Sequence, residues 1–252
     1  MIKEISHVAI NTKDYESMQK VLTGLGLKKK FVLNTPEGQE RIGYFEMPDH
    51  HFVEMFPPLS GENPVFVSDN NPSKRSFQKA VLNRDDESLE FTDPENTEWI
   101  LGKSGKAQGL YEVIYDADDL RKTEEFYSLL LNMKPDIFNS QILEYKLPSS
   151  QIIRFIQSSH KRGDLNFSND RAYHHIALVT DDIFKDARRM NDLNIPISYG
   201  PNRAGRFYSH PYEESCHLGS DGSYAFYVED PDGNDLELMM YTPASRQLPE
   251  NA

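Results

Sequence analysis

The stretch IGYFEMPDHHFVE, residues 42–54, is followed one hundred positions later by ILEYKLPSSQIIR, residues 142–154. Each stretch has an apolar segment, a proline among polar residues, and a second apolar segment, so each predicts a strand, a turn and a strand. A unit that returns at a fixed spacing indicates a repeated supersecondary structure. We therefore expect a fold built from copies of one module.

The residues upstream of the two hairpins repeat as well. ISHVAINTKDYESMQKVLTGLGL predicts a strand that ends at Asn11 and a helix that begins near Asp14. LYEVIYDADDLRKTEEFYSLLLNM predicts a strand that ends at Asp116 and a helix capped by Asp118 or Asp119. With the hairpin, each copy has the order β-α-β-β-β.

The same order occurs twice more along the chain. A clear copy joins YHHIALVTDDIFKDARRMNDLNI to the hairpin YVEDPDGNDLELMMY, whose Pro, Asp, Gly and Asn residues predict a tight turn. A weaker copy joins NPSKRSFQKAVL, predicted as a helix over 71–82, to the hairpin LEFTDPENTEWIL. The four modules span roughly 2–57, 58–103, 109–158 and 172–242. Modules one and two would form a first half, residues 1–105, and modules three and four a second half, residues 106–252.

Composition limits the class of protein. The formal net charge of −13 argues against nucleic acid or an anionic membrane as a partner. A single cysteine, Cys216, excludes an internal disulfide and is typical of a reducing compartment. No apolar run in the sequence has the length of a signal peptide or a membrane span. We expect a cytoplasmic protein.

The four modules resemble the vicinal oxygen chelate superfamily. The resemblance rests on the repeated β-α-β-β-β order, on HVAI and HIAL in the first strands, and on DPDGNDLEL in the last hairpin. That superfamily includes glyoxalase I, methylmalonyl-CoA epimerase, extradiol dioxygenases and the fosfomycin and bleomycin resistance proteins. The resemblance implies an α+β fold in which paired modules curl two mixed sheets into cups. It also implies metal ligands on the first and last strands of a module.

Modules one and four match those ligand positions. The resemblance assigns His7 and Glu54 in module one, and His175 and Glu237 in module four. Two imidazoles and two carboxylates suit one divalent zinc, nickel, cobalt, manganese or iron ion. Any one of the four side chains alone is more often structural than catalytic. Because all four expected positions hold a chelating residue, we interpret them as a metal site.

Module three departs from the pattern and indicates how the modules pair. It has Glu112 at the histidine position and Arg154 at the glutamate position, and module two closes on Ile100 or the neighbouring Trp99. Crossed pairing, one with four and two with three, unites the full ligand set and lets Glu112 pair with Arg154. Sequential pairing would leave Arg154 beside the cation. We favour crossed pairing.

A long segment without helix or strand pattern covers residues 199–223. Such a segment is either a surface excursion with incidental aromatic residues or a lid over the substrate. As part of a lid, His210 or His217 would donate or accept a proton near neutral pH. The resemblance to extradiol dioxygenases places an assisting histidine and tyrosine near His217 and Tyr227. Three further side chains of module one could line the same cup: Arg41, Tyr44 and His51.

Three functions are consistent with these residues. The first is a metal-dependent lyase or isomerase, in which the ion chelates two neighbouring substrate oxygens and stabilises an enediolate while Glu54 or Glu237 moves a proton. The second is an extradiol dioxygenase, which would need three protein ligands rather than four. The third is a non-enzymatic binding or resistance protein. In each case the partner is a small molecule with vicinal oxygens, and the chain is a monomer or a homodimer.

Overall fold

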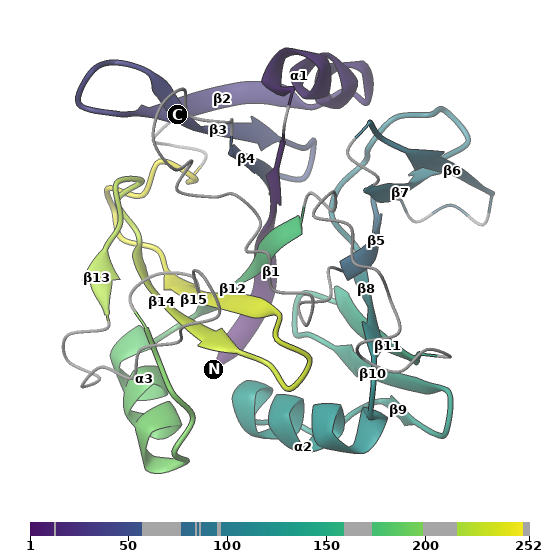
Figure 1. Ribbon diagram of the computed structural model, residues 1–252, viewed down its shortest axis with the longest axis vertical. Coiled ribbons are helices and arrows are strands. Elements are labelled where there is room, and N and C mark those ends of the chain that lie inside the picture. Colours follow the sequence, from purple (N-terminus) through teal and green to yellow (C-terminus); the bar gives the residue numbers. More distant parts are fainter. Residues whose placement is uncertain are drawn as a thin grey trace.

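The computed structural model describes most of the chain, and its elements form two mixed sheets (Figure 1). The described residues are 1–12, 14–56, 77–83, 85, 87–94, 97–158, 173–198 and 216–248. Purple, green and yellow strands make up the first sheet, and the second, largely teal, lies beside it.

The first sheet has eight strands in the order β13-β14-β15-β12-β1-β4-β3-β2. Its module-one strands are β1 (Ile2–Asn11), β2 (Lys28–Asn34), β3 (Glu40–Glu46) and β4 (Phe52–Phe56). Its module-four strands are β12 (Tyr173–Thr180), β13 (His217–Leu218), β14 (Tyr224–Glu229) and β15 (Asp235–Met240). The antiparallel pair β1 and β12 joins the two modules at the centre of the sheet.

The second sheet has seven strands in the order β6-β7-β5-β8-β11-β10-β9. Its module-two strands are β5 (Phe77–Val81), β6 (Ser88–Thr92) and β7 (Glu98–Gly102). Its module-three strands are β8 (Glu112–Ala117), β9 (Ile137–Phe138), β10 (Ile142–Lys146) and β11 (Ile152–Gln157). Modules one and four share one sheet and modules two and three share the other, so crossed pairing is confirmed. The division of the chain at residue 105 stays a prediction.

Each helix follows the first strand of its module and begins after an aspartate. The helices are α1 (Tyr15–Gly24), α2 (Leu120–Leu131) and α3 (Ile183–Asp192). The carboxylates of Asp14, Asp119 and Asp182 accept hydrogen bonds from backbone N–H groups of the first turn. These bonds satisfy donors that have no partner inside the helix. The starts predicted near Asp14 and at Asp118 or Asp119 are confirmed.

Module two corrects one prediction. Residues 77–81 form strand β5 and not part of a helix, while residues 71–76 lie outside the described part of the chain. The spacing of Phe77, Ala80 and Val81 fits a helical stripe, but the same segment also alternates: Ala80 and Leu82 are fully buried. Because β5 bonds to β8 on one side and β7 on the other, sheet pairing decides its conformation.

The two faces of the first sheet have different surroundings. One face packs with all three helices and with residues of the second sheet in a single large core. The opposite face, which we call the cup face, carries two smaller apolar clusters. Their buried members are Ala9, Phe31, Ile42, Tyr44, Phe52 and Phe56 in one, and Ala177, Val179 and Met239 in the other. Since side chains alternate along a strand, His7 shares the cup face with Ala9.

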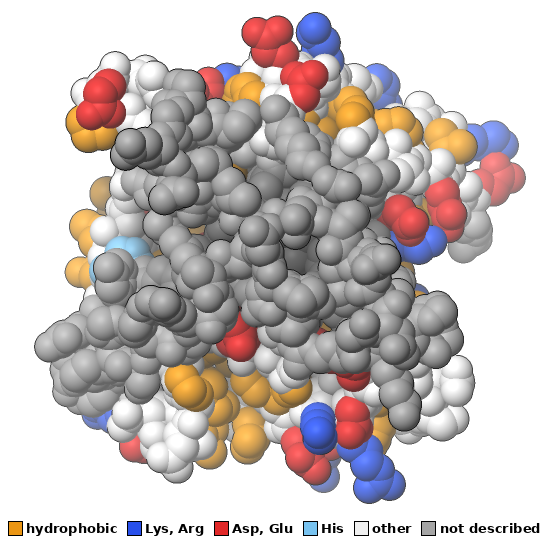
Figure 2. Space-filling model, viewed as in Figure 1, with side chains coloured by type: hydrophobic (Ala, Val, Ile, Leu, Met, Phe, Trp, Pro, Cys, Tyr) orange, Lys and Arg blue, Asp and Glu red, His pale blue; other side chains and the backbone are white. Residues whose placement is uncertain are grey.

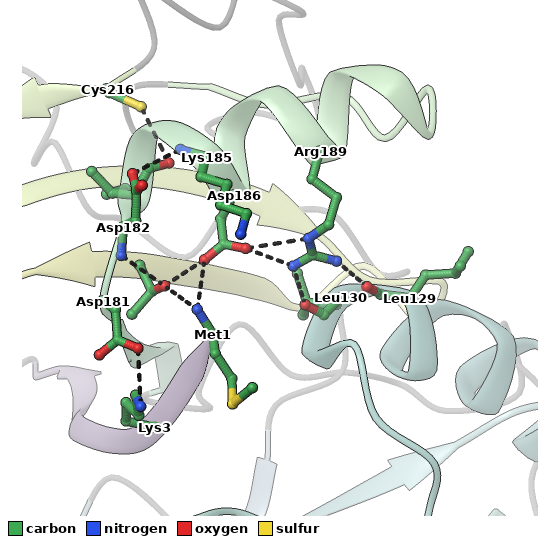
Figure 3. Close-up of polar contacts among 12 residues, drawn as sticks. Met1, Lys3, Leu129, Leu130, Asp181, Asp182, Lys185, Asp186, Arg189 and Cys216 are labelled. Carbon is green, nitrogen blue, oxygen red and sulfur yellow. Dashed lines mark hydrogen bonds and ion pairs between the residues drawn. The ribbon is translucent and has the colours of Figure 1, made fainter.

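Polar side chains also join the two sheets. The buried amide of Gln151, just before β11, donates to the carbonyls of Ile5 (3.0 Å) and Leu110 (2.9 Å), and its oxygen accepts from the Ile5 N–H (2.7 Å). On α3, Arg189 pairs with Asp186 and donates to the Leu129 and Leu130 carbonyls at the end of α2 (Figure 3). These contacts fix one module pair against the other.

Among the described residues visible around the rim of Figure 2, blue Lys and Arg side chains lie interspersed with red Asp and Glu side chains. This distribution agrees with the net charge of −13. Among the helices of the described residues, none has both the length and the apolar composition needed to cross a membrane.

Candidate metal centre

The predicted ligands lie on four neighbouring strands of the first sheet. His7 is on β1, Glu54 on β4, His175 on β12 and Glu237 on β15. The order β15-β12-β1-β4 makes these the four central strands. The structure therefore brings together residues that are separated by more than half of the chain.

Strand register places the four side chains on the same face. Ala9 of β1 lies opposite His175 on one side and Glu54 on the other. Ala177 of β12 likewise lies opposite His7 and Glu237. An approximate two-fold between β1 and β12 thus relates the ligand pairs, as expected for two copies of one module.

The donor atoms converge on one point. The His7 Nε2 lies 3.2 Å from the Glu54 Oε2 and 3.4 Å from the Glu237 Oε2. The His175 Nε2 lies 3.3 Å and 2.9 Å from the same two oxygens, and the two ring nitrogens are 3.3 Å apart. Adjacent ligands of an ion bound at about 2.1 Å lie about 3.0–3.4 Å apart. All four atoms lie within 4.8 Å of one another, so the set fits a single ion.

Burial and charge set the protonation of the four groups. Both histidines are 1% exposed, Glu54 4% and Glu237 9%. Burial lowers the pKa of His7, but the charge of Glu54 and hydrogen bonds to both carboxylates outweigh it and raise the pKa to about 10. Burial is likewise outweighed at His175, whose pKa is raised by its hydrogen bonds to Glu237 and Glu54. Two protons can thus neutralise two carboxylates, as a divalent cation would.

The carboxylates are correspondingly acidic. Burial raises the pKa of Glu54, but the charge of His7 and hydrogen bonds to both histidines hold it well below its usual range. At Glu237 the bonds to His175 and His7 outweigh burial and lower the pKa to about 2. Both side chains are therefore ionised and available as oxygen ligands at neutral pH.

A tyrosine on each neighbouring outer strand faces each carboxylate. Tyr44 on β3 pairs with Glu54 in the ladder, and its hydroxyl donates to the Glu54 Oε1 at 2.5 Å. Tyr227 on β14 pairs with Glu237, and its ring lies edge-on to His175 with centroids 5.4 Å apart. Burial, followed by the carboxylate charges, raises the pKa of both hydroxyls well above the usual range, so both remain protonated donors.

The remaining sequence candidates have different positions. His217 on β13 lies opposite Ala225 on the cup face, one row from Tyr227 and outside the cluster of four. His210 lies outside the described residues, as does most of the segment 199–223. His51 precedes β4 and lies outside the cluster of four: its Nδ1 is 2.8 Å from the Asp49 carboxylate, which also accepts from the Leu110 N–H, and its place in the cup stays a prediction. The side chain of Arg41 is not described.

Sequence reasoning missed a set of polar residues behind His7. The His7 Nδ1 lies 3.3 Å from the Gln247 Oε1 and 3.4 Å from the Ser6 hydroxyl. Gln247 in turn donates to Asp221 at 3.0 Å. No spacing rule could have identified Gln247, because it follows the last strand and no equivalent occurs in another module.

The second cup has an ion pair at the positions of a histidine and a glutamate. Glu112 and Arg154 occupy the positions of His7 and Glu54, and their side chains pair at 2.7 Å as predicted. Glu144, which sequence reasoning did not include, also pairs with Arg154, at 3.0 Å. Burial raises the pKa of Glu112 although the Arg154 charge opposes this effect.

Module two completes the replacement. Lys79 of β5 lies opposite Ile114, which is the position that His175 has in the first cup. Ile100 of β7 stands at the position of Glu237. The Lys79 amine pairs with Glu90 at 3.2 Å and Glu98 at 3.3 Å. Cations and an apolar side chain thus replace ligands in this cup.

Comparisons with known proteins agree with this architecture. Glyoxalase I from Zea mays has a TM-score of 0.62 at 16% identity, over 99% of this chain and 95% of that one. A mutant of the same maize protein gives 0.64 at 16% identity, with 94% of each chain covered. A Bacillus subtilis protein for which a dioxygenase activity is proposed gives 0.64 at 13% identity, over 96% of this chain and 86% of that one. At these identities the likeness shows the fold alone.

Sequence comparison gives the family directly. No curated protein matches the chain. The family described as Glyoxalase/Bleomycin resistance protein/Dioxygenase superfamily matches residues 113–238, which is half of the 252 residues. This segment runs from β8 into β15 and includes two of the four clustered side chains, His175 and Glu237. The chain belongs to the Glyoxalase/Bleomycin resistance protein/Dioxygenase superfamily.

Proposed function

We propose that the chain is a divalent-metal-dependent lyase or isomerase of the glyoxalase I-like type. The metal ligands would be His7, Glu54, His175 and Glu237. The observation that supports this most strongly is the convergence of two imidazole nitrogens and two carboxylate oxygens on one buried point, with separations of 2.9–3.4 Å. Nitrogen and oxygen ligands of this kind suit zinc, nickel, cobalt, manganese or iron.

A divalent ion supplies positive charge that stabilises negative charge developing on two neighbouring substrate oxygens. The chain itself would supply the base. The Glu237 side chain is 12% exposed against 6% for Glu54, and one oxygen of Glu54 already accepts the Tyr44 hydroxyl. We therefore assign proton transfer at the substrate carbon to Glu237. Glu54, fixed by Tyr44, would remain a ligand throughout.

The surroundings suit this chemistry. The four groups lie between the two apolar clusters of the cup face, which limit the access of water to the reacting atoms. Tyr227 is a protonated donor on the strand next to Glu237 and would hold that carboxylate in place. The substrate would be a small molecule with vicinal oxygens.

The test separates ligand from base. Glu237→Gln keeps an oxygen ligand but removes the proton acceptor, so the variant should retain metal while proton exchange at the substrate carbon falls by about 10²–10⁴-fold. Exchange is followed by NMR in deuterated water, with 2-oxoaldehyde–thiol adducts and epimerisable acids as substrates. Glu54→Gln is the matched variant and should mainly weaken metal binding. Full exchange activity in Glu237→Gln would refute the assignment of the base.

An extradiol dioxygenase is the second candidate, favoured by the position of His217 on the same face of the sheet as Tyr227. This chemistry uses iron or manganese and leaves positions for both catechol and oxygen, which a fourth protein ligand restricts. Loading with ferrous ion and assaying catechols for ring cleavage tests it. Cleavage that depends on His217 would favour this candidate over the lyase or isomerase.

A binding or resistance protein that uses the same cup is the third candidate. It would retain its ligand-binding surface without proton exchange on any substrate of the panel. We also propose a reducing, cytoplasmic location, because the chain has a single cysteine. The chain would act as a monomer or a homodimer.

A further inference from the structure

The segment after β15 crosses from module four to module one and reaches the back of the metal centre. Gln247 of this segment is 4% exposed and lies 240 residues from His7 in the sequence, yet its Oε1 is 3.3 Å from the His7 Nδ1. A histidine of module one therefore has its outer contact on the segment that follows module four. We call residues 242–248 the C-terminal strap.

The hydrogen-bond directions around Gln247 identify the proton on His7. Gln247 donates its Nε2 to the Asp221 Oδ2 at 3.0 Å, and a carboxylate oxygen accepts. The other end of the amide is thus the oxygen, which also accepts from the Ser6 hydroxyl at 2.8 Å. An oxygen can only accept, so His7 must donate from Nδ1. The Nε2, which faces the three other clustered groups, is then the ring nitrogen that would give up its proton to bind an ion.

The strap contacts both modules. On module four, the Arg246 N–H donates to the Asp221 carbonyl at 2.7 Å, and the Thr242 hydroxyl donates to the Gly222 carbonyl at 2.7 Å. Gly222 has φ +87°, and a Cβ there would collide with the Ala244 carbonyl oxygen. On module one, the Arg246 guanidinium lies 4.3 Å from the centre of the Phe31 ring.

Ser6 adds a second contact from the same direction. Its hydroxyl is 1% exposed and lies 2.8 Å from the Tyr241 hydroxyl, at the residue that precedes the strap. Because Ser6 donates to Gln247, Tyr241 must be the donor in this pair. Tyr241 thus donates to Ser6, and Ser6 donates to the Gln247 Oε1. His7 donates to the same Oε1 from its Nδ1.

We propose that Gln247 is a positioning residue that holds His7 as the Nδ1–H tautomer, and that the strap thereby contributes to metal binding. The inference rests on the metal site of the proposed function. The amide oxygen fixes which ring nitrogen keeps its proton and how the ring is turned. Groups that hold the outer nitrogen of a histidine ligand typically change metal affinity by about 10–100-fold.

The experiment compares zinc affinity, by competition with a fluorescent chelator at fixed pH, among four forms of the full chain. Gln247→Leu removes the acceptor at similar volume and should weaken zinc binding about ten-fold or more. Gln247→Glu combined with Asp221→Asn keeps an acceptor toward Nδ1 and reverses the bond between the two side chains, so affinity should return close to that of the natural sequence. Gln141→Leu, at an exposed position, is the matched control and should change nothing.

Each outcome has one meaning. Unchanged affinity in Gln247→Leu, or a double variant as weak as Gln247→Leu, would overturn the positioning role while leaving the metal site intact. Absence of zinc binding by the natural sequence would overturn the metal site itself. If Gln247→Leu does not fold, the zinc-loaded natural sequence suffices: long-range ¹H–¹⁵N spectra should show His7 protonated at Nδ1 with zinc at Nε2. The opposite tautomer would refute the inference.

Discussion

At the scale of residues, the negative charge of two buried carboxylates at the metal centre must be compensated. Two buried carboxylates without compensating charge would carry a large desolvation cost. In the described structure that compensation comes from His7 and His175, whose pKa values are raised by the two glutamates. A bound divalent cation supplies the same charge. Protons and metal therefore compete for one site.

This competition predicts proton release on metal binding. The His7 pKa, raised to about 10, keeps that metal-free histidine protonated at pH 7, and the pKa of His175 is raised in the same direction by Glu237 and Glu54. Binding should release protons, so metal affinity should rise with pH. Calorimetric titration in buffers with different ionisation enthalpies gives the number released. A binding enthalpy independent of the buffer would contradict the competition.

The same pKa values determine how the histidines affect the stability of the metal-free protein. Each folded pKa lies above the unfolded value of about 6.5. The stabilising contribution is therefore fully present below pH 6.5 and is lost as the pH rises through the folded value, about 10 for His7. Metal-loaded protein should lose less stability over this range.

At the scale of elements, equivalent strand positions carry ligands in one cup and ion pairs in the other. Both cups have the same register, so the difference comes from side chains alone. Arg154 accounts for most of this change, since its guanidinium bonds to both Glu112 and Glu144. The second cup is thus held together by charge pairing where the first would be held by an ion.

Arg154→Ala should accordingly destabilise the fold without affecting the metal centre. The Arg154 side chain is 31% exposed, so solvent screens part of its interaction, and we expect a loss of about 1–2 kcal/mol in the free energy of unfolding. Urea unfolding measures the loss, and Arg121→Ala on an exposed position of α2 is the control. Uptake of a second metal ion by Arg154→Ala would instead indicate that the arginine masks a site.

At the scale of the whole molecule, crossed pairing makes the first and the last module neighbours in one sheet. Module four returns to module one after the second sheet is complete, and β1 bonds to both β4 and β12. The second sheet then supports β1 through Gln151, whose amide bonds to both the N–H and the carbonyl of Ile5. The strand that carries His7 is held from both sides.

Gln151→Leu should weaken this support. It removes hydrogen bonds to Ile5 and Leu110 and leaves buried backbone groups without a partner, which we expect to cost about 2–4 kcal/mol. Gln39→Leu, at an exposed turn position, should cost much less. Thermal or urea unfolding of the two variants provides the comparison. Equal stability would mean that the sheets are held together by their apolar core alone.

The sequence allowed the starts of α1 and α2, the crossed pairing and the clustering of four side chains to be predicted, because each depends on a local pattern or on a repeated position. It did not reveal β5, since residues 77–82 fit two periodicities and only pairing with β7 and β8 decides between them. Nor did it reveal Gln247 or Asp221, which meet His7 only through tertiary approach.

The most direct test of the central claim is elemental analysis of the purified protein after loading with divalent ions, beside His7→Ala and His175→Ala. Two crossed modules that share one centre should bind about one ion per chain, and each variant should lose most of it. The two losses should be similar, because the histidines are equivalent across the two-fold. Full metal content in His7→Ala, or no metal in the natural sequence, would contradict the account.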